Sequence, residues 1–414
     1  MQNKYIHWFN LAACLPGRDP TSIPSSQEDT MLSLRLLRYA FYTLTILPLL
    51  CPAYCDEDVH PEEHAHHAHG STGHEDYSPL GVMGNHVHQA GEAMFSYRYG
   101  IMEMNGNLDG STSVSTQDIL DAGFMMAPTS MRMEMHMLGA MYAASDSITL
   151  MAMLPLKRIE MSSRMPMPAN PSMTMTRKAK TSGAGDLKLA GIFPLWATGD
   201  HSRTLILNAG LSIPTGSIKE TGPGMNGGET MRLPYPMQLG SGTFDLLPGL
   251  TYIAEKFGGS WGTQVASVIH LGENGEGYSL GNRFQATTWY SRKLSDTLSA
   301  SARIEGSTWG NIDGQDAEMN PMMSPNARAD LRGGERVDIL FGLNIFLDTD
   351  RWDKWDRLFI DKDNGQLLQA KPQENSMDKE TLLSIEIGFP VHQDLDGPQM
   401  ESDWRLMVGL QVSF

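Results

Sequence analysis

The stretch 402–414, SDWRLMVGLQVSF, carries the clearest structural signal in the chain. Its apolar side chains recur at every second position and end at Phe414, whereas Arg405, Gln411 and Ser413 occupy alternate positions. Successive side chains of a β-strand point to opposite faces, so this pattern predicts a strand with one apolar and one polar face. A strand of about ten residues also has the length that crosses a bilayer at a tilt. The stretch therefore predicts a membrane-spanning strand with a terminal aromatic residue.

Similar segments recur along the chain, and short polar turns alternate with longer links between them, which is typical of bacterial outer-membrane barrels. Such a link is expected at 158–184, whereas the link 348–380 is long where a short turn is due and is interpreted as an insert. A secreted β-sandwich is the alternative. The prediction is an all-β protein, a transmembrane antiparallel β-barrel of about 12 strands (roughly 10 to 14). The expected strands lie near 92–104, 131–143, 147–157, 185–195, 202–212, 243–254, 260–271, 281–293, 297–309, 335–347, 381–390 and 402–414.

The N-terminal region predicts export. Arg35 and Arg38 precede an apolar run at 40–50 and then small residues, the plan of a cleaved signal peptide, with a short membrane anchor as the alternative. Cys14, Cys51 and Cys55 all lie in or before this segment, so no disulfide is expected in the mature chain. We divide the chain into an extra or non-native extension (1–30), a signal peptide (31–55), a disordered His-rich acidic periplasmic tail (56–90) and the barrel (91–414).

Charge and motifs exclude several classes of function. The formal net charge of −17 argues against a nucleic-acid partner, because neutralising phosphates requires clustered Lys and Arg. The sequence has no phosphate loop, dinucleotide fingerprint or G-x-S-x-G nucleophile motif. We therefore expect no enzymatic activity.

A histidine-rich tract follows the signal segment, and acidic residues are interleaved with it. Neutral imidazole binds borderline metals such as Cu(II), Zn(II) and Ni(II), so the tract is a candidate metal-binding tail. A solvated low-complexity tail without function is the alternative. The candidate ligands are His60, His64, His66, His67, His69, His74, His86 and His88.

The chain also contains 29 methionines. Met131 to Met137 alternate along one predicted strand; because polar residues normally face a barrel lumen, these methionines are expected to face lipid. Thioether sulfur is a soft ligand that favours Cu(I) or Ag(I), which is the alternative role. Methionines in the predicted link 158–184 have no membrane burial to explain them. The candidate ligands there are Met165, Met167, Met173 and Met175.

The polar positions of the predicted strands define the expected lumen surface. Charged residues on these faces pair across a barrel interior or hold it open. The residues expected to face the lumen are Arg132, Glu134, His136, Arg283, Gln285, Arg303, Glu305, Glu386, Arg405 and Gln411, with Asp338 and Asn344 as companions.

Several long stretches resemble a known family: MGNHVHQAGEAMFSYRYGIMEMNGN at 83–107, LPYPMQLGSGTFDLLPGLTY at 233–252 and DLRGGERVDILFGLN at 330–344, joined by 131–155, 309–321 and 389–400. They are similar to outer-membrane transporters related to the "meta-pathway of phenol degradation" proteins. The resemblance covers roughly 83–414 and implies a barrel and a transport role, without a settled substrate. The Met-containing loop at 158–180 and the acidic insert depart from that pattern.

These observations leave three hypotheses: a transporter of small solutes linked to copper or silver, a pore for small aromatic or apolar compounds, and a non-transporting metal-binding surface protein. No cofactor is expected beyond a Cu(I), Cu(II) or similar soft or borderline ion. The expected location is the outer membrane, with both termini in the periplasm. The expected partners are outer-membrane lipid, the transported solute or metal ion, and the barrel-assembly machinery, which would read the C-terminal strand ending in Phe414.

Overall fold

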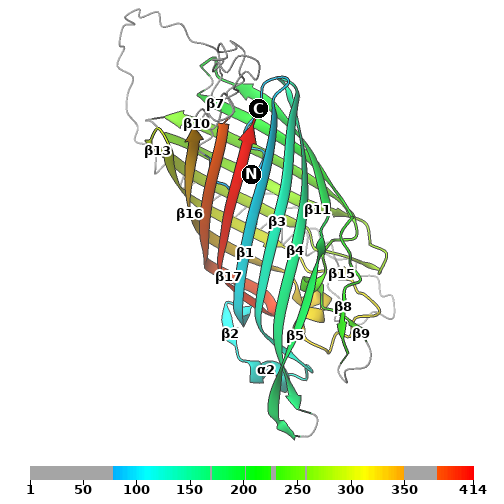
Figure 1. Ribbon diagram of the computed structural model, residues 1–414. Helices are drawn as coiled ribbons and strands as arrows, with labels where there is room; N and C mark the ends of the chain where they lie inside the picture. The colour runs from blue at the N-terminus through cyan, green and yellow to red at the C-terminus, as the bar shows by residue number, and fades with distance from the viewer. Residues whose placement is uncertain (1–77, 168–169, 201, 225–229, 257–258, 349–379) are drawn as a thin grey trace, which may run out of the picture.

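The computed structural model describes residues 78–167, 170–200, 202–224, 230–256, 259–348 and 380–414. Eleven strands pair antiparallel into one wall, which closes where β17 meets β1 (Figure 1). The all-β barrel fold expected from the sequence is confirmed. The wall strands are β1 (Ala93–Gly110), β3 (Ala127–Ser145), β4 (Ile148–Met167), β6 (Leu187–Ala197), β7 (Arg203–Ile213), β10 (Phe244–Lys256), β11 (Gly259–Leu271), β13 (Arg283–Ser295), β14 (Leu298–Trp309), β16 (Gly334–Asp348) and β17 (Glu380–Ser413).

The strand β17 is unusually long because it crosses the wall twice. Its first part pairs with β16 as far as Leu395, and its second part, from Leu395 to Ser413, pairs with β1. The chain turns next to Gly397, whose φ of +104° favours glycine. Ten strands thus cross once and β17 twice, which gives twelve crossings. The expected number of about 12 strands is close to the eleven that the structure labels.

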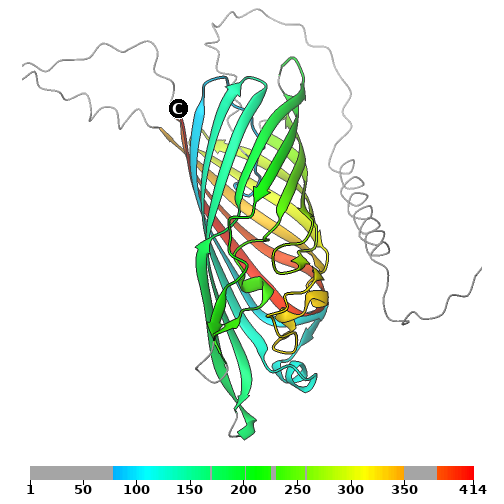
Figure 2. The ribbon, with the colours of Figure 1, turned by 90° about the vertical axis from the view of Figure 1, so that its right-hand side faces the viewer.

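Two further strands lie outside the closed ring. β2 (Thr112–Val114) pairs with β1, and β5 (Asn170–Ala184) pairs with the far part of β4. The expectation of a loop at 158–184 is therefore wrong, because β4 and β5 form a two-stranded extension beyond the wall (Figure 2). Burial explains the difference. Ile159, Met161 and Met165 pack against loops on the inner side of β4, so the strand continues with alternating buried and exposed side chains.

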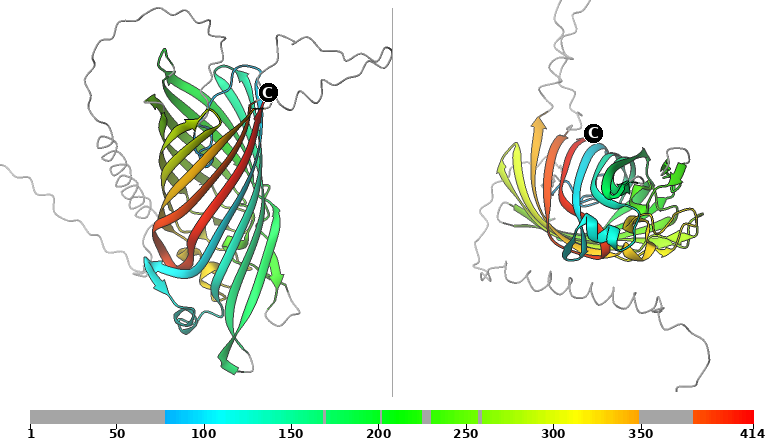
Figure 3. Two further views of the ribbon diagram at one scale, coloured as in Figure 1. Left: turned by 60° about the vertical axis from the view of Figure 1, so that its left-hand side comes forward. Right: turned by 90° about the horizontal axis from the view of Figure 1, so that it is seen from below.

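The two ends of the barrel differ in their connections. At the end that carries the C-terminus, here called the terminal end, β3–β4, β6–β7, β10–β11 and β13–β14 are joined by short turns (Figure 1). The predicted insert 348–380 lies almost wholly outside the described residues. The long connections gather at the opposite loop end (Figure 3, right). They contain α2 (Thr116–Asp121), β8 (Thr221–Pro223), β9 (Thr230–Arg232), η2 (Tyr235–Met237), β12 (Tyr278–Ser279), β15 (Asp313–Gly314), η3 (Pro325–Ala327) and η4 (Ala329–Leu331).

The outer face of the wall is apolar over much of its height. Phe95, Leu150, Val265 and Phe341 are each at least half exposed, and they belong to strands spread around the ring. Apolar side chains at such exposure are typical of a surface that contacts lipid. No helix among the described residues is long and apolar enough to cross a membrane.

Apolar clusters also occur inside the loop end. The loop segment 233–239 contributes Leu233, Met237 and Leu239 to one cluster, where they pack against Met131 and Met161 of the wall. Thr181 of β5 donates a hydrogen bond to the Met237 carbonyl at 2.9 Å, and Lys157 of β4 donates one to the Leu239 carbonyl at 2.8 Å. The loop thus lines the inner side of β4 and β5 and narrows the lumen.

Candidate functional site: a closed lumen with an apolar pocket

The first part of the segment 78–90, expected to be part of a disordered tail, lies inside the barrel, and its last residues reach the terminal end. Arg98 of β1 donates to the Leu80 carbonyl at 3.0 Å, Gln264 of β11 to the Met83 carbonyl at 2.8 Å, and Asn344 of β16 to the Ser78 carbonyl at 3.1 Å. These donors come from strands on different sides of the ring, so the segment crosses the lumen. The space is tight, because a Cβ added at Gly81 would collide with Arg303 Nη2.

A network of charged side chains lines the lumen beside this segment. Arg303 pairs with Glu386 at 2.5 Å and with Glu305 at 2.5 Å, and Arg405 pairs with Glu305 at 2.7 Å and with Asp338 at 3.0 Å. Alternation along β14, β16 and β17 places these groups on the inner face, and mutual pairing compensates for their removal from water. Of the other residues expected to face the lumen, Gln411 bonds to Arg98 at 3.4 Å, and Arg283 and Gln285 lie on the inner face of β13.

Arg132, Glu134 and His136 lie on the outer face of β3, not in the lumen as expected. The alternate residues Met131 and Met133 line an internal pocket together with side chains from across the barrel, which fixes the orientation of the strand. Arg132 instead pairs with Glu103 at 3.2 Å and with Glu134 at 3.0 Å.

The height of these residues on the wall explains their orientation. The outer face of β4 changes from Leu154 and Leu156 to Arg158 and Glu160 at the same level, and Arg158 pairs with Glu160 at 2.7 Å. Polar side chains are expected to face the lumen where lipid covers the outer wall. These charged residues lie beyond the apolar band, toward the loop end, where that expectation does not apply. Most inner positions at this level are apolar because the loop segment 233–239 covers them, and the inner Lys157 is satisfied by the Leu239 carbonyl.

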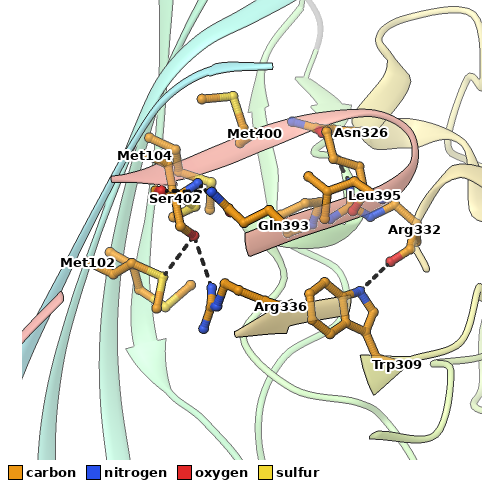
Figure 4. Close-up of a pocket in the computed structure, with 14 residues that line it drawn as sticks. Met102, Met104, Trp309, Asn326, Arg332, Arg336, Gln393, Leu395, Met400 and Ser402 are labelled. Carbon is orange, nitrogen blue, oxygen red and sulfur yellow. Dashed lines mark hydrogen bonds between the residues drawn. The ribbon is translucent and has the colours of Figure 1, made fainter. Parts of the chain in front are cut away.

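A pocket of about 230 Å³ opens in the lumen near the loop end (Figure 4). Met102 and Met133 are register partners on β1 and β3, as are Met104 and Met131, and together they form one wall. Trp309 adds an aromatic ring and donates its indole N–H to the Arg332 carbonyl at 2.8 Å. The remaining lining residues are Pro236, Asn326, Arg332, Arg336, Gln393, Leu395, Gln399, Met400 and Ser402.

The polar side of the pocket is held in place by hydrogen bonds. Arg336 donates from Nη1 to Ser402 Oγ at 3.0 Å and from Nε to Asp338 at 3.1 Å. Gln393 bonds to the Ser402 backbone through both of its amide atoms, at 3.0 Å each (Figure 4). The pocket thus combines soft apolar side chains with a few oriented polar groups, which is typical of small-molecule sites.

The polar side of this pocket is not marked by the sequence patterns that predicted the lumen surface. Arg336 and Asp338 alternate on β16 as Arg303 and Glu305 do on β14, and that pattern could have indicated Arg336. Arg332 follows a short 3-10 helix in the loop end, and no local pattern marks it. Its position depends on the loop fold.

Those predicted metal ligands that the structure describes are not brought into one site. Met165 is buried among Tyr235, Tyr278 and other loop side chains, whereas Met173 and Met175 are exposed. Met167, near the tip of β4, is partly buried. His86 and His88 lie at the terminal end, with ring centroids 4.8 Å apart. His60, His64, His66, His67, His69 and His74 lie outside the described residues.

Comparison with known proteins gives a fold and no family. No family model matches the sequence, and no curated protein is significantly similar to it. The COG4313 outer membrane channel from Pseudomonas putida F1 is 13% identical, with a TM-score of 0.50 over 80% of this chain and 98% of that chain. A Pseudomonas aeruginosa FadL homologue is 11% identical, with a TM-score of 0.35 over 78% of this chain and 90% of that one. The P. putida toluene transporter TodX is 9% identical, with a TM-score of 0.34 over 78% and 89%. At these identities the first match shows the fold alone: the chain has the barrel fold of an outer-membrane channel.

Proposed function

We propose that the protein is an outer-membrane channel for small apolar compounds, including those with a single aromatic ring. The closed wall satisfies its own backbone hydrogen bonds and exposes an apolar outer band, as insertion in lipid requires. A lumen that ends in a pocket suits passage of a solute better than surface anchoring. No catalytic role is proposed.

The pocket of Met102, Met104, Met131, Met133 and Trp309 is the observation that carries this proposal. An apolar protein cavity of about 150 Å³ is large enough for benzene. The pocket of about 230 Å³ therefore admits one substituted ring. Thioether groups adapt their shape and contact aromatic edges favourably, so they suit ligands of varied outline.

Passage through the barrel must be gated. The segment 78–90 fills the lumen beside the charged network, and the loop segment 233–239 narrows it at the loop end. A compound that enters the pocket can travel further only when one of these segments moves. Gated passage agrees with the narrow, occupied lumen better than an open pore does.

Binding to the purified barrel tests the proposal. Toluene should bind with measurable heat in titration calorimetry and should change the tryptophan fluorescence, a change that Trp309→Phe should reduce. Met131→Glu places a charge in the apolar wall and should abolish binding, whereas Met322→Glu, at an exposed loop position, should leave it unchanged. Equal binding by the wild type and by Met131→Glu would overturn the assignment of the pocket.

A role in copper or silver handling has one supporting observation. The register pairs Met102–Met133 and Met104–Met131 bring four thioethers to one surface, and soft cations favour such sulfur ligands. The guanidinium groups of Arg332 and Arg336 on the same pocket oppose a cation, so the organic solute is the better candidate. A deletion strain with unchanged copper and silver sensitivity and unchanged metal content would exclude the metal role.

A further inference from the structure

Arg332 presents a positive charge to the pocket without an acidic partner. Its Nη1 donates to Asn326 Oδ1 at 3.1 Å, and no carboxylate of the described residues lies within ion-pair distance of it. The guanidinium is largely removed from water, and this desolvation lowers the pKa of Arg332 to about 10. The group is still charged at neutral pH, and a charge in such surroundings is costly until an anion joins it.

The surroundings of the pocket add to this excess of positive charge. Arg283 lies 5.4 Å from the ring centroid of Trp309, and Asp338 is shared between Arg336 and Arg405. The pocket and the adjoining network contain five guanidinium groups and three carboxylates, a net excess of two positive charges. The positive members are Arg283, Arg303, Arg332, Arg336 and Arg405, and the negative members are Glu305, Asp338 and Glu386.

Three further carboxylates are engaged elsewhere, and one of them, Asp396, accepts a hydrogen bond from Asn311 at 3.1 Å. Asp245 pairs with His270 at 2.7 Å, and Asp186 accepts the backbone N–H groups of Gly216 and Ser241 at 2.9 and 2.8 Å. A local excess of positive charge is notable in a chain whose formal net charge is −17. Inward-facing charge of one sign concentrates ligands of the opposite sign.

We infer that the pocket binds apolar compounds that carry a carboxylate, with Arg332 receiving the anionic group and the methionines and Trp309 enclosing the apolar part. This inference rests on the proposed function and narrows it to one class of substrate. Guanidinium groups recognise planar carboxylates through paired hydrogen bonds. Figure 4 shows Arg332 on the side of the pocket opposite Met102 and Met104, whereas the guanidinium of Arg336 reaches toward Ser402, beside Met102. Arg336, which is held by Asp338 and Ser402, adds positive charge to the same pocket.

The test compares two ligands of nearly equal shape. Titration calorimetry on the purified full-length barrel would measure 4-methylbenzoate against the neutral 4-methylbenzamide at pH 7. Charge-assisted hydrogen bonds predict roughly tenfold to hundredfold tighter binding of the carboxylate. Equal or tighter binding of the amide would overturn the inference and leave the proposed function standing. Binding of neither compound, nor of toluene, would overturn both.

Variants assign the preference to Arg332. Arg332→Gln should remove most of the preference for 4-methylbenzoate, and Arg332→Lys should retain part of it because the charge stays. Arg328→Gln is the matched control, since Arg328 lies in the same loop region and is paired with Asp330. An unchanged preference in Arg332→Gln would overturn the role of this residue. If Arg332→Gln fails to fold, comparing the binding of the two ligands to the wild type and to Arg332→Lys still tests whether the charge of this residue sets the preference.

Discussion

Arg303 is the residue on which the inner charged network depends most directly. Its side chain is 2% exposed and pairs with two buried carboxylates, Glu305 and Glu386. Arg303→Gln would leave both acids without this partner inside the barrel. We expect the free energy of unfolding to fall by about 3–5 kcal/mol, the usual effect of breaking a buried pair.

Urea unfolding of the barrel refolded in detergent would measure this loss. Arg158→Gln is the control, because Arg158 is 50% exposed and pairs with Glu160 on the outer face. Exposed pairs contribute about 0–1 kcal/mol, so the control should unfold nearly as the wild type does. Similar losses in the two variants would mean that the inner network does not stabilise the barrel as its burial suggests.

The segment 78–90 is the element expected to control conductance. A Cβ at Gly81 would collide with Arg303 Nη2 and would lie 2.6 Å from Glu386 Oε1, so Gly81→Val should expel the segment from its place. Planar-bilayer recordings should then show larger or more frequent conductance steps than the wild type. Gly199→Val is the control, because a Cβ at Gly199 in a turn at the terminal end meets nothing within 4 Å. Unchanged conductance in Gly81→Val would show that the segment does not limit ion passage.

The loop end is held together by a second ionic cluster, whose stability should depend on pH. Arg232, with a side chain 3% exposed, pairs with Glu276 at 2.8 Å, Glu318 at 2.6 Å and Asp316 at 3.1 Å. The hydrogen bond from Lys219, together with the charges of Lys219 and Arg232, lowers the pKa of Glu276. A carboxyl with a lowered pKa stabilises the fold above its ordinary pKa and loses that contribution as pH falls through the lowered value.

We therefore expect the loops to stay ordered from neutral pH down through the ordinary carboxyl range and to loosen only below it. Hydrogen exchange of the loop amides, corrected for the intrinsic effect of pH, would measure this. Lys219→Gln removes the main cause of the lowered pKa, so loosening should begin at a higher pH in that variant. The same onset in both proteins would count against the role of Glu276.

The difference between the two ends predicts the orientation of the whole molecule in the membrane. Barrels of this kind place short turns in the periplasm and long loops outside the cell. A cysteine at Gln315 in the loop end should react with a membrane-impermeant maleimide on intact cells, and one at Ser147 in a terminal-end turn should not. Permeabilised cells provide the control, because both positions should then react. Labelling of Ser147→Cys alone on intact cells would reverse the orientation.

Alternation along each strand determined the fold class of this protein. A period of two is a local property, visible in 402–414 and repeated along the chain, and in lipid only a closed wall pairs every backbone group. The same alternation separated Arg303 and Glu305 from their apolar neighbours, and the structure has them on the inner face. These features depend on residues that are adjacent in sequence, which is why the sequence alone was enough.

Only the tertiary structure decided which face of β3 is inside. Arg132 and Met131 alternate equally well in either orientation, and the choice depends on the height of the strand relative to lipid and on the loop segment 233–239 that covers Met131. The tertiary structure also decided the pocket, which joins β1, β3, β14, β16 and β17 with Arg332 from a loop. Residues so far apart in sequence share no local pattern, because their proximity arises from closure of the wall and packing of the loops within it.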